Sequence, residues 1–148
     1  MAGLDDISVA NYTRISYETT PGSGTYTDIA EVQSIGELTD EKTIIDVQEY
    51  GVQYMRKLVG SANAGPLELI INLNPAETTH QYLFTAYKND TRVKFQLRMT
   101  NAANDKGDSV TFTALVASKS FGNEFDTART ASVSLAIDGA ISDLTADV

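Results

Sequence analysis

The residue best suited to acid–base chemistry is His80, the only histidine in the 148-residue chain. A catalytic histidine needs a nucleophile beside it and a group that orients its ring. The Gly-x-Ser-x-Gly sequence of a nucleophile elbow is absent. Gly22-Ser23-Gly24 lacks the lysine and the following helix of a phosphate-binding loop. We therefore interpret His80 as a surface residue of a helix, and a small hydrolase would require a nucleophile next to it.

Carboxylates that lie close together in the sequence are the next candidates, because they bind hard cations. Calcium needs about six to eight oxygen ligands at defined spacing, and segment 105–108 offers only part of such a loop, without its distal glutamate. The chain has no cysteine, which excludes disulfides and thiolate metal sites. We therefore predict no catalytic residue, no metal and no cofactor. The tightest carboxylate groups are Asp5–Asp6, Asp40–Glu41 and Asp105–Asp108.

The net charge of −9 is distributed unevenly along the chain. Residues 1–55 carry ten acidic and two basic side chains, whereas residues 56–98 carry three acidic and six basic ones. Residues 99–148 carry seven acidic and three basic side chains. This separation favours association between opposite faces of identical copies, although a solvated acidic surface explains it equally well. An acidic chain does not bind the phosphate backbone of nucleic acids tightly.

The length and the termini define the expected domain organisation. The N-terminal residues are acidic where a secretion signal needs basic ones, so we expect no signal peptide. No segment approaches the roughly 18 apolar residues of a membrane span. We predict one domain over residues 1–148, with mobile tails at 1–11 and 139–148.

Apolar and polar residues alternate with a period of two through much of the chain, which predicts strands. In residues 92–100 (RVKFQLRMT) every second position is apolar, and residues 110–116 repeat the pattern. The turn-like cluster at 101–108 lies between them, so the two segments should form a hairpin. Further strands are expected at 42–50, 67–73 and 132–137, with weaker candidates at 12–17 and 29–35.

One helix is expected after the strand at 67–73. Asn74 is a suitable N-cap, Pro75 occupies the first helical position, and Glu77 lies at the third, as in a capping box. The helical pattern fades at residues 88–90. The apolar stripe of this helix consists of Tyr82, Leu83, Ala86 and Tyr87. These elements predict a largely antiparallel sheet with a single helix packed on it.

The segment Gly51–Pro66, between the expected strands 42–50 and 67–73, is long for a turn. It carries four apolar residues, and a soluble monomer gains little by exposing them to water. A protein that contacts neighbouring copies of itself would bury them. An Ω-loop that folds back on its own domain is the alternative. The four residues are Tyr54, Met55, Leu58 and Val59.

The order of these elements resembles the tail tube (major tail) proteins of siphophages, the lambda-like phages with long, non-contractile tails. The resemblance covers roughly residues 12–137. It is carried best by IAEVQSIGEL (29–38), by IIDVQEY (44–50) and by the glycine-containing segment that ends in GSANAG (60–65). The family is defined by its architecture rather than by invariant residues, and it has no catalytic motif.

The resemblance implies an antiparallel β-sandwich or β-barrel with one flanking helix and a long inter-strand loop. It also implies a structural virion protein whose hexameric rings stack into the tube that delivers the phage genome. The expected partners are other copies of the chain, tail-tip initiator and terminator proteins, and the tape-measure protein and DNA, which pass through the lumen without specific binding. The expected location is the phage tail, assembled in the host cytoplasm, without membrane contact.

The resemblance also implies roles for individual residues. The long loop should contact the next subunit or ring, and its two basic residues should pair with the acidic N-terminal third of a neighbour. The interface residues implied are Tyr54, Met55, Arg56, Lys57, Leu58 and Val59. Residues on the polar side of two neighbouring strands should line the lumen, unless they are ordinary solvent-facing strand residues. These are Asp46 and Gln48, which alternate with Ile45 and Val47 as core residues, and Glu68 and Asn72.

Three further functions are open. A tail terminator or a secretion-system tube protein would be another β-rich component of a particle. A monomeric β-sandwich that binds carbohydrate or protein should expose a cluster of aromatic residues, and the absence of tryptophan counts against sugar binding. A small hydrolase is the third.

Overall fold

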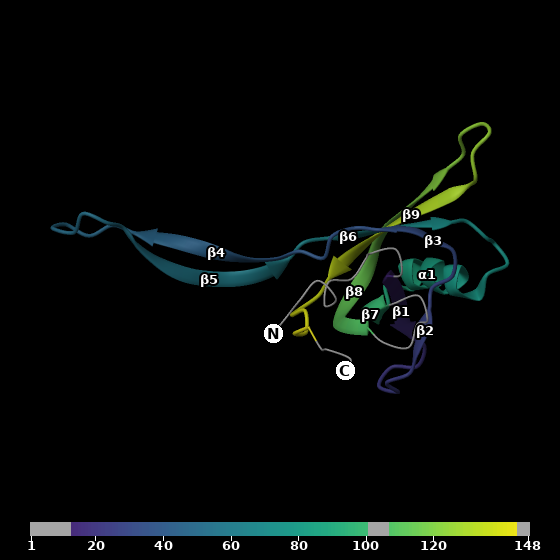
Figure 1. The fold of residues 1–148 in the computed structure, drawn as a ribbon, viewed down its shortest axis with the longest axis horizontal. Helices are drawn as coiled ribbons and strands as arrows, with labels where there is room; N and C mark the ends of the chain where they lie inside the picture. Colours follow the sequence, from purple (N-terminus) through teal and green to yellow (C-terminus); the bar gives the residue numbers. More distant parts are fainter. Residues whose placement is uncertain (1–12, 101–106, 145–148) are drawn as a thin grey trace, which may run out of the picture.

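The computed structural model describes residues 13–100 and 107–144. Within these ranges the chain is mainly β, with one helix, as the sequence predicts (Figure 1). The elements are β1 (Thr13–Glu18), β2 (Tyr26–Asp28), β3 (Val32–Ile35), β4 (Asp40–Val47), β5 (Arg56–Ala64), β6 (Leu67–Asn72), α1 (Thr78–Asn89), β7 (Arg92–Thr100), β8 (Gly107–Gly122) and β9 (Thr130–Ile137).

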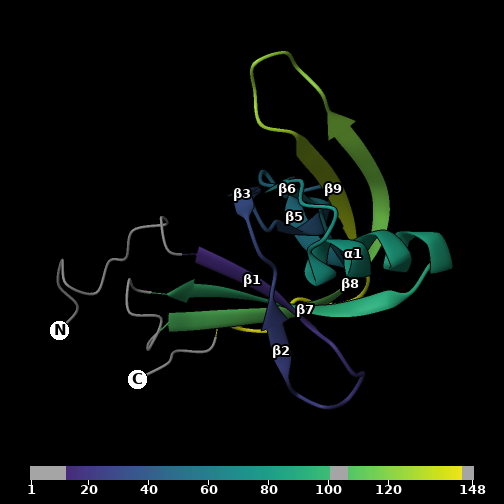
Figure 2. The ribbon, with the colours of Figure 1, turned by 90° about the vertical axis from the view of Figure 1, so that its right-hand side faces the viewer.

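The strands form two separate sheets. Seven strands make one antiparallel sheet in the order β2-β1-β7-β8-β9-β6-β3, and β4 pairs only with β5 in a second, two-stranded sheet. The large sheet curls, and α1 packs against it (Figure 2). The two-stranded sheet extends away from this body on the side opposite to α1 (Figure 1).

The core follows directly from the period-two pattern. Leu67, Leu69 and Ile71 of β6 are fully buried, and each lies opposite a fully buried residue of β9. The intervening side chains of both strands face outward, as alternation along a strand requires. The predicted hairpin of residues 92–100 and 110–116 is present as β7 and β8, and Phe95 stacks on Phe112 with ring centroids 5.7 Å apart. Most of its predicted turn, residues 101–106, lies outside the described residues.

The two weaker strand predictions are partly right. The predicted strand 12–17 is present as β1, although Tyr12 lies outside the described residues, and the predicted strand 29–35 is shorter and forms β3. A short strand, β2, was missed. The turn between β1 and β2 has Gly22 and Gly24 at φ +82° and +73°, a left-handed conformation that glycine adopts without strain. The carboxylate of Glu18 accepts a hydrogen bond from the backbone N–H of Gly22.

The segment between the edge strands β2 and β3 crosses from one side of the curled sheet to the other. The backbone N–H of the buried Ile29 donates to the carbonyl of Ile15 in β1 (2.9 Å). The carbonyl of Glu31 accepts from the N–H of Asn72 in β6 (2.8 Å). Residues 29–31 therefore connect β1 to β6, and the sheet surrounds a single core.

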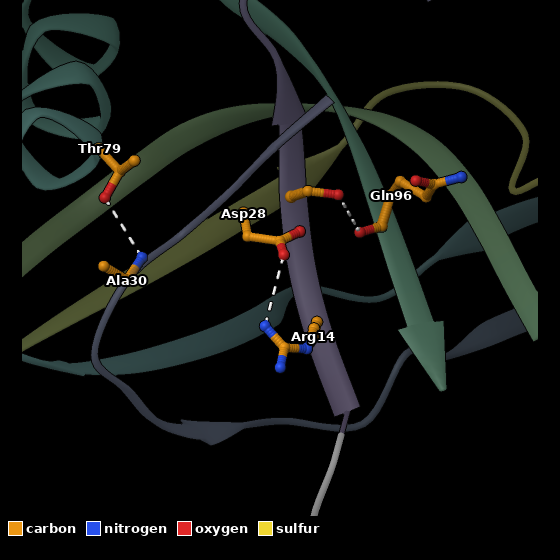
Figure 3. A network of polar contacts seen from close by, with 6 residues as sticks. Arg14, Asp28, Ala30, Thr79 and Gln96 are labelled. Carbon is orange, nitrogen blue, oxygen red and sulfur yellow. Dashed lines mark hydrogen bonds and ion pairs between the residues drawn. The ribbon is translucent and has the colours of Figure 1, made fainter. Parts of the chain in front are cut away.

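Side-chain contacts fix the position of this crossing segment (Figure 3). The N–H of Ala30 donates to Thr79 Oγ1 of α1 (3.3 Å), which ties the segment to the helix. At the end of β2, the carboxylate of Asp28 lies 3.5 Å from the guanidinium of Arg14. This ion pair is half exposed, so it contributes at most about 1 kcal/mol.

The helix begins later than the capping pattern predicts. α1 starts at Thr78, with Glu77 as the N-cap, rather than at Pro75 after Asn74. Asn74 instead caps a turn, because its Oδ1 accepts from the N–H of Ala76 (3.2 Å) and its carbonyl accepts from the N–H of Glu77 (3.0 Å). The local signature is therefore satisfied by a turn that precedes the helix. The predicted end is confirmed, since Asp90 is the left-handed C-cap (φ 53°).

His80 is fully buried, so its assignment as a surface residue is wrong. Its Nδ1 accepts a hydrogen bond from the N–H of Asn74 (3.3 Å), and its Nε2 lies 2.7 Å from the carbonyl oxygen of Ala30. These partners assign the neutral tautomer with the proton on Nε2. The ring thus joins α1 to the crossing segment and to the turn before the helix. Both ring nitrogens are occupied by backbone groups.

The described part of the predicted C-terminal tail, residues 139–144, contacts β8. The N–H of Ser142 donates to the carbonyl of Thr111 (2.9 Å), and Ser142 Oγ accepts from the N–H of Thr111 (2.8 Å). The side chain of Ile141 packs against the core. The predicted mobility of residues 1–11 and 145–148 concerns segments outside the described residues.

The buried position of His80 predicts a large loss of stability when its ring is removed. We expect His80→Ala to lower the free energy of unfolding by about 2–4 kcal/mol, because it leaves a cavity and two unpaired backbone groups. Urea denaturation followed by circular dichroism measures this change. Thr85→Ala, at an exposed position of the same helix, is the matched control and should change stability by less than about 0.5 kcal/mol. A loss below about 1 kcal/mol for His80→Ala would contradict the buried arrangement.

Candidate assembly surface

The most exposed apolar feature of the molecule is the hairpin formed by β4, β5 and their connecting residues 48–55, here called the β4–β5 hairpin. The segment Gly51–Pro66 was predicted as a loop, and this is wrong, because most of it is strand β5. The small residues Gly60–Ala64 obscured the strand pattern. At Gly60 a Cβ would lie 3.2 Å from the carbonyl oxygen of Thr43 on the paired strand, so the close approach of the two strands favours glycine there.

The hairpin continues a ribbon that begins in the large sheet. β3 pairs with β6 up to the pair Ile35 and Leu69. The N–H of Gly36 then donates to the carbonyl of Glu68 (2.7 Å), and the N–H of Gly65 donates to that of Thr39 (2.9 Å). The pairing resumes in β4 and β5. Buried strand β6 therefore determines the direction in which the hairpin leaves the body.

Both faces of the β4–β5 hairpin are apolar. Ile44 lies opposite Val59, and Ile45 lies opposite Leu58. Because successive residues of a strand point to opposite faces, one pair lies on each face. All four side chains are exposed, by 48–65%. The predicted core position of Ile45 is therefore wrong within the single chain, since the described part of the body leaves these side chains exposed on both faces.

The residues that connect the two strands are also apolar and exposed. Tyr50 is fully exposed and Tyr54 is 79% exposed, and Val52 and Met55 lie beside them. Twelve large hydrophobic side chains are exposed among the described residues, and eight of them belong to this hairpin. A two-stranded hairpin is only marginally stable in water by itself, so this concentration of apolar surface indicates a contact with other protein. The alternative of an Ω-loop folded back on its own domain is wrong.

One ion pair lies on the hairpin. Lys57 Nζ is 2.6 Å from Asp46 Oδ1, and these residues are directly opposite each other. Both are exposed, so the pair adds at most about 1 kcal/mol. Lys57 was predicted to pair with a neighbouring subunit, but here its partner belongs to the same hairpin. Arg56 lies opposite Val47.

The four residues predicted to line a lumen fall into two groups. Asp46 and Gln48 belong to the exposed hairpin, whereas Glu68 and Asn72 lie on the outer side of β6. β6 pairs with β3 and β9, so it is not the hydrogen-bonded neighbour of β4 that the prediction assumed. Glu68 Oε1 accepts from Ser132 Oγ of β9 (2.9 Å). The lumen assignment stays a prediction.

No arrangement for catalysis stands out among the described residues. They contain no group of three or more His, Cys, Asp and Glu side chains able to hold a metal ion. No helix within them has the length and apolar character needed to cross a membrane. The pKa of Tyr17 is raised, first by burial and then by Tyr82 and Glu77 nearby, so its phenol stays protonated at neutral pH. Tyr17 stacks on Tyr82 with ring centroids 4.2 Å apart, which is a core contact.

Sequence reasoning found four apolar residues of this surface and missed four others. Tyr54, Met55, Leu58 and Val59 were predicted as contact residues, and all four are exposed. The missed residues are Ile44, Ile45, Tyr50 and Val52. The adjacent isoleucines were the available signal, because two consecutive apolar residues in a strand place one on each face.

Comparison with known proteins shows which fold this is. No protein-family model and no curated protein sequence matches the chain. A chain in the anti-feeding prophage baseplate aligns with a TM-score of 0.77 and 15% identity over 96% of both chains. A chain in the virion of a native gene transfer agent aligns with a TM-score of 0.70 and 17% identity, over 90% of this chain and 95% of that chain. The SPP1 tail tube gives a TM-score of 0.68 and 18% identity, over 92% of this chain and 77% of that chain. The chain therefore has the tail tube fold.

The lack of cover over the β4–β5 hairpin predicts fast hydrogen exchange in the free protein. We expect backbone amides of β5 to exchange at least about 100-fold faster than those of β9, because opening the hairpin exposes little buried surface. Hydrogen–deuterium exchange of the monomer, read by mass spectrometry, measures this ratio. Equal protection of the two strands would show that the hairpin is already covered in solution.

Proposed function

We propose that this chain is a structural subunit of a tail tube of a phage or phage-like particle. Copies assemble into hexameric rings, and the rings stack into a hollow conduit for genome delivery. The observation that carries the proposal is the β4–β5 hairpin, which exposes apolar residues on both faces and projects from the body. The tail tube fold supports it, because chains of this fold occur in the SPP1 tail tube and in a gene transfer agent virion.

The proposal assigns the hairpin to contacts between copies. A contact between two different surfaces of identical copies closes into rings or extends into a filament, depending on the rotation between them. Such a contact requires each copy to project one surface and to offer another. The projecting surface consists of Ile44, Ile45, Tyr50, Val52, Tyr54, Met55, Leu58 and Val59, with Arg56 and Lys57 at its border.

The role is structural and non-enzymatic, and the proposed location is the tail of the particle. The only histidine uses both ring nitrogens to hold backbone groups together, so it does not serve as a general base. Tail-tip initiator and terminator proteins would start and end the tube, and the tape-measure protein and DNA would pass through it. The outer face of β6, with Glu68 and Asn72, is the proposed lining, because a carboxylate there repels phosphate groups.

A monomeric binding module is the competing function. It requires the exposed apolar residues to bind a different molecule while the protein stays a monomer. Another tube-forming component, such as a terminator or a secretion-system tube protein, shares the fold and the self-assembly. The state of assembly therefore distinguishes the proposed tail tube subunit from a monomeric binding module. The particle in which the protein is found distinguishes it from another tube-forming component.

Self-assembly is tested by electron microscopy of the purified protein, concentrated and with a tail-tip initiator present, alongside mass from light scattering. We expect rings or hollow tubes. Leu58→Asp should abolish them while leaving the circular dichroism spectrum and the melting temperature of the monomer unchanged within about 2 °C, because Leu58 is exposed. Ser23→Asp, in the turn between β1 and β2, adds the same charge and should still assemble. Tubes formed normally by Leu58→Asp would contradict the role of the hairpin.

A further inference from the structure

An open groove lies between the C-terminal half of α1 and strand β8. The helix lies on the side of the body away from the β4–β5 hairpin (Figure 1). Its volume is about 990 Å³. Phe84 and Tyr87 of α1 form part of its wall, and Leu115, Ala117 and Lys119 of β8 form another part. None of these residues belongs to the projecting surface described above, so the groove is a second surface.

A β-bulge in β8 shapes the groove. The pairing of β8 with β9 shifts between Val116 and Ser118, which adds one residue to β8 and changes the side on which later residues lie. Lys119 and Phe121 then face α1. Lys119 Nζ lies 5.6 Å from the ring centroid of Phe84 and 5.1 Å from that of Tyr87. The rings of Phe84 and Phe121 meet edge to face, with centroids 5.7 Å apart.

The groove is aromatic and has an excess of positive charge. Three basic residues line it, Lys88, Arg92 and Lys119, against one acidic residue, Asp90. Arg92 is already paired, because its Nε lies 2.7 Å from the carboxylate of Asp138. The two lysines therefore give the groove its charge. Aromatic rings together with lysines suit a partner that carries aromatic side chains and a carboxylate.

The tip of the β4–β5 hairpin, residues 48–55, has this chemistry. It contains two exposed tyrosines, Tyr50 and Tyr54, and its single charged residue is Glu49. Glu49 is exposed. The tip lies at the opposite end of the molecule from α1, which forms one wall of the groove, so tip and groove do not meet within one chain (Figure 1). They meet only when the tip belongs to a second copy.

We infer that the α1–β8 groove binds the hairpin tip, residues 48–55, of a neighbouring copy. The tyrosines of the tip pack on Phe84 and Tyr87, and Glu49 lies near Lys88 and Lys119. This contact joins two different surfaces of identical chains, so it repeats from copy to copy. The inference rests on the proposed function and adds the receiving surface to it.

Photo-crosslinking in the assembled protein tests the contact directly. p-Benzoylphenylalanine replaces Tyr54 in the tip, and the crosslinked peptides from rings or tubes are identified by mass spectrometry. We expect adducts with residues 84–92 or 115–121 of a second copy. The same amino acid at Phe125, which is exposed on the β8–β9 connection, is the control and should not label these peptides. Assembled protein whose Tyr54 adducts all lie elsewhere would overturn the inference and leave the proposed function intact.

A charge reversal in the groove gives an independent measurement. We expect Lys119→Glu to raise the concentration needed for assembly at least tenfold, because it sets a carboxylate against Glu49 and removes the cation from the two rings. Lys94→Glu, at an exposed position of β7, makes the same change of charge outside the groove and should have less than a twofold effect. Equal effects would assign the loss to net charge and overturn the inference. A wild-type protein that stays monomeric under every condition, initiator included, would overturn the proposed function and this inference together.

Discussion

The arrangement of the molecule depends on one continuous antiparallel ribbon, in which β3 and β6 lie at the buried end and β4 and β5 at the solvent-exposed end. At the buried end, Leu67, Leu69 and Ile71 of β6 are inaccessible to solvent and lie opposite the core residues of β9. Backbone hydrogen bonds at Gly36 and Gly65 carry the pairing through the junction to β4 and β5. The hydrophobic effect thus fixes the half of the ribbon formed by β3 and β6. Continuous hydrogen bonding then sets the direction of the half formed by β4 and β5, which has no core of its own.

The contacts that hold the described part of the body together do not involve the β4–β5 hairpin. The crossing segment 29–31 links β1 to β6, and His80 and Thr79 attach α1 to it through the backbone of Ala30. The edge strands β2 and β3 are short, which leaves little unpaired backbone for uncontrolled association. The apolar residues available for contact between copies are therefore concentrated where the ribbon projects.

Much of the body could be predicted from sequence, because its strands each bury one face and so alternate clearly. β6, β7 and β9 follow this rule, and so does β8 as far as Val116. The hairpin was predicted only in part. The expected strand 42–50 is present as β4 (Asp40–Val47), but alternation assigned one apolar face to it, whereas Ile44 and Ile45 make both faces apolar. Strand β5 was missed because small residues fill its end. His80 was misassigned because its partner Ala30 is distant in the sequence, and a local pattern does not contain that contact. The start of α1 was misassigned because Asn74 caps a turn before the helix, and the capping pattern does not distinguish this turn from the first turn of the helix. The groove depends on a bulge at Ala117, which shows in no local pattern.

The separation of the hairpin tip from the α1–β8 groove has a genetic consequence. Each copy carries one projecting and one receiving surface, and the tip of the projecting surface, residues 48–55, contributes no side chain to the core. When copies associate head to tail, a copy with an altered tip can still bind the tip of a neighbour in its groove. Its own tip, however, no longer binds the groove of the next copy. Such a copy ends growth wherever it is incorporated. Missense alleles in residues 48–55 would thus be dominant over the wild type wherever both proteins are present together, although the altered protein folds normally.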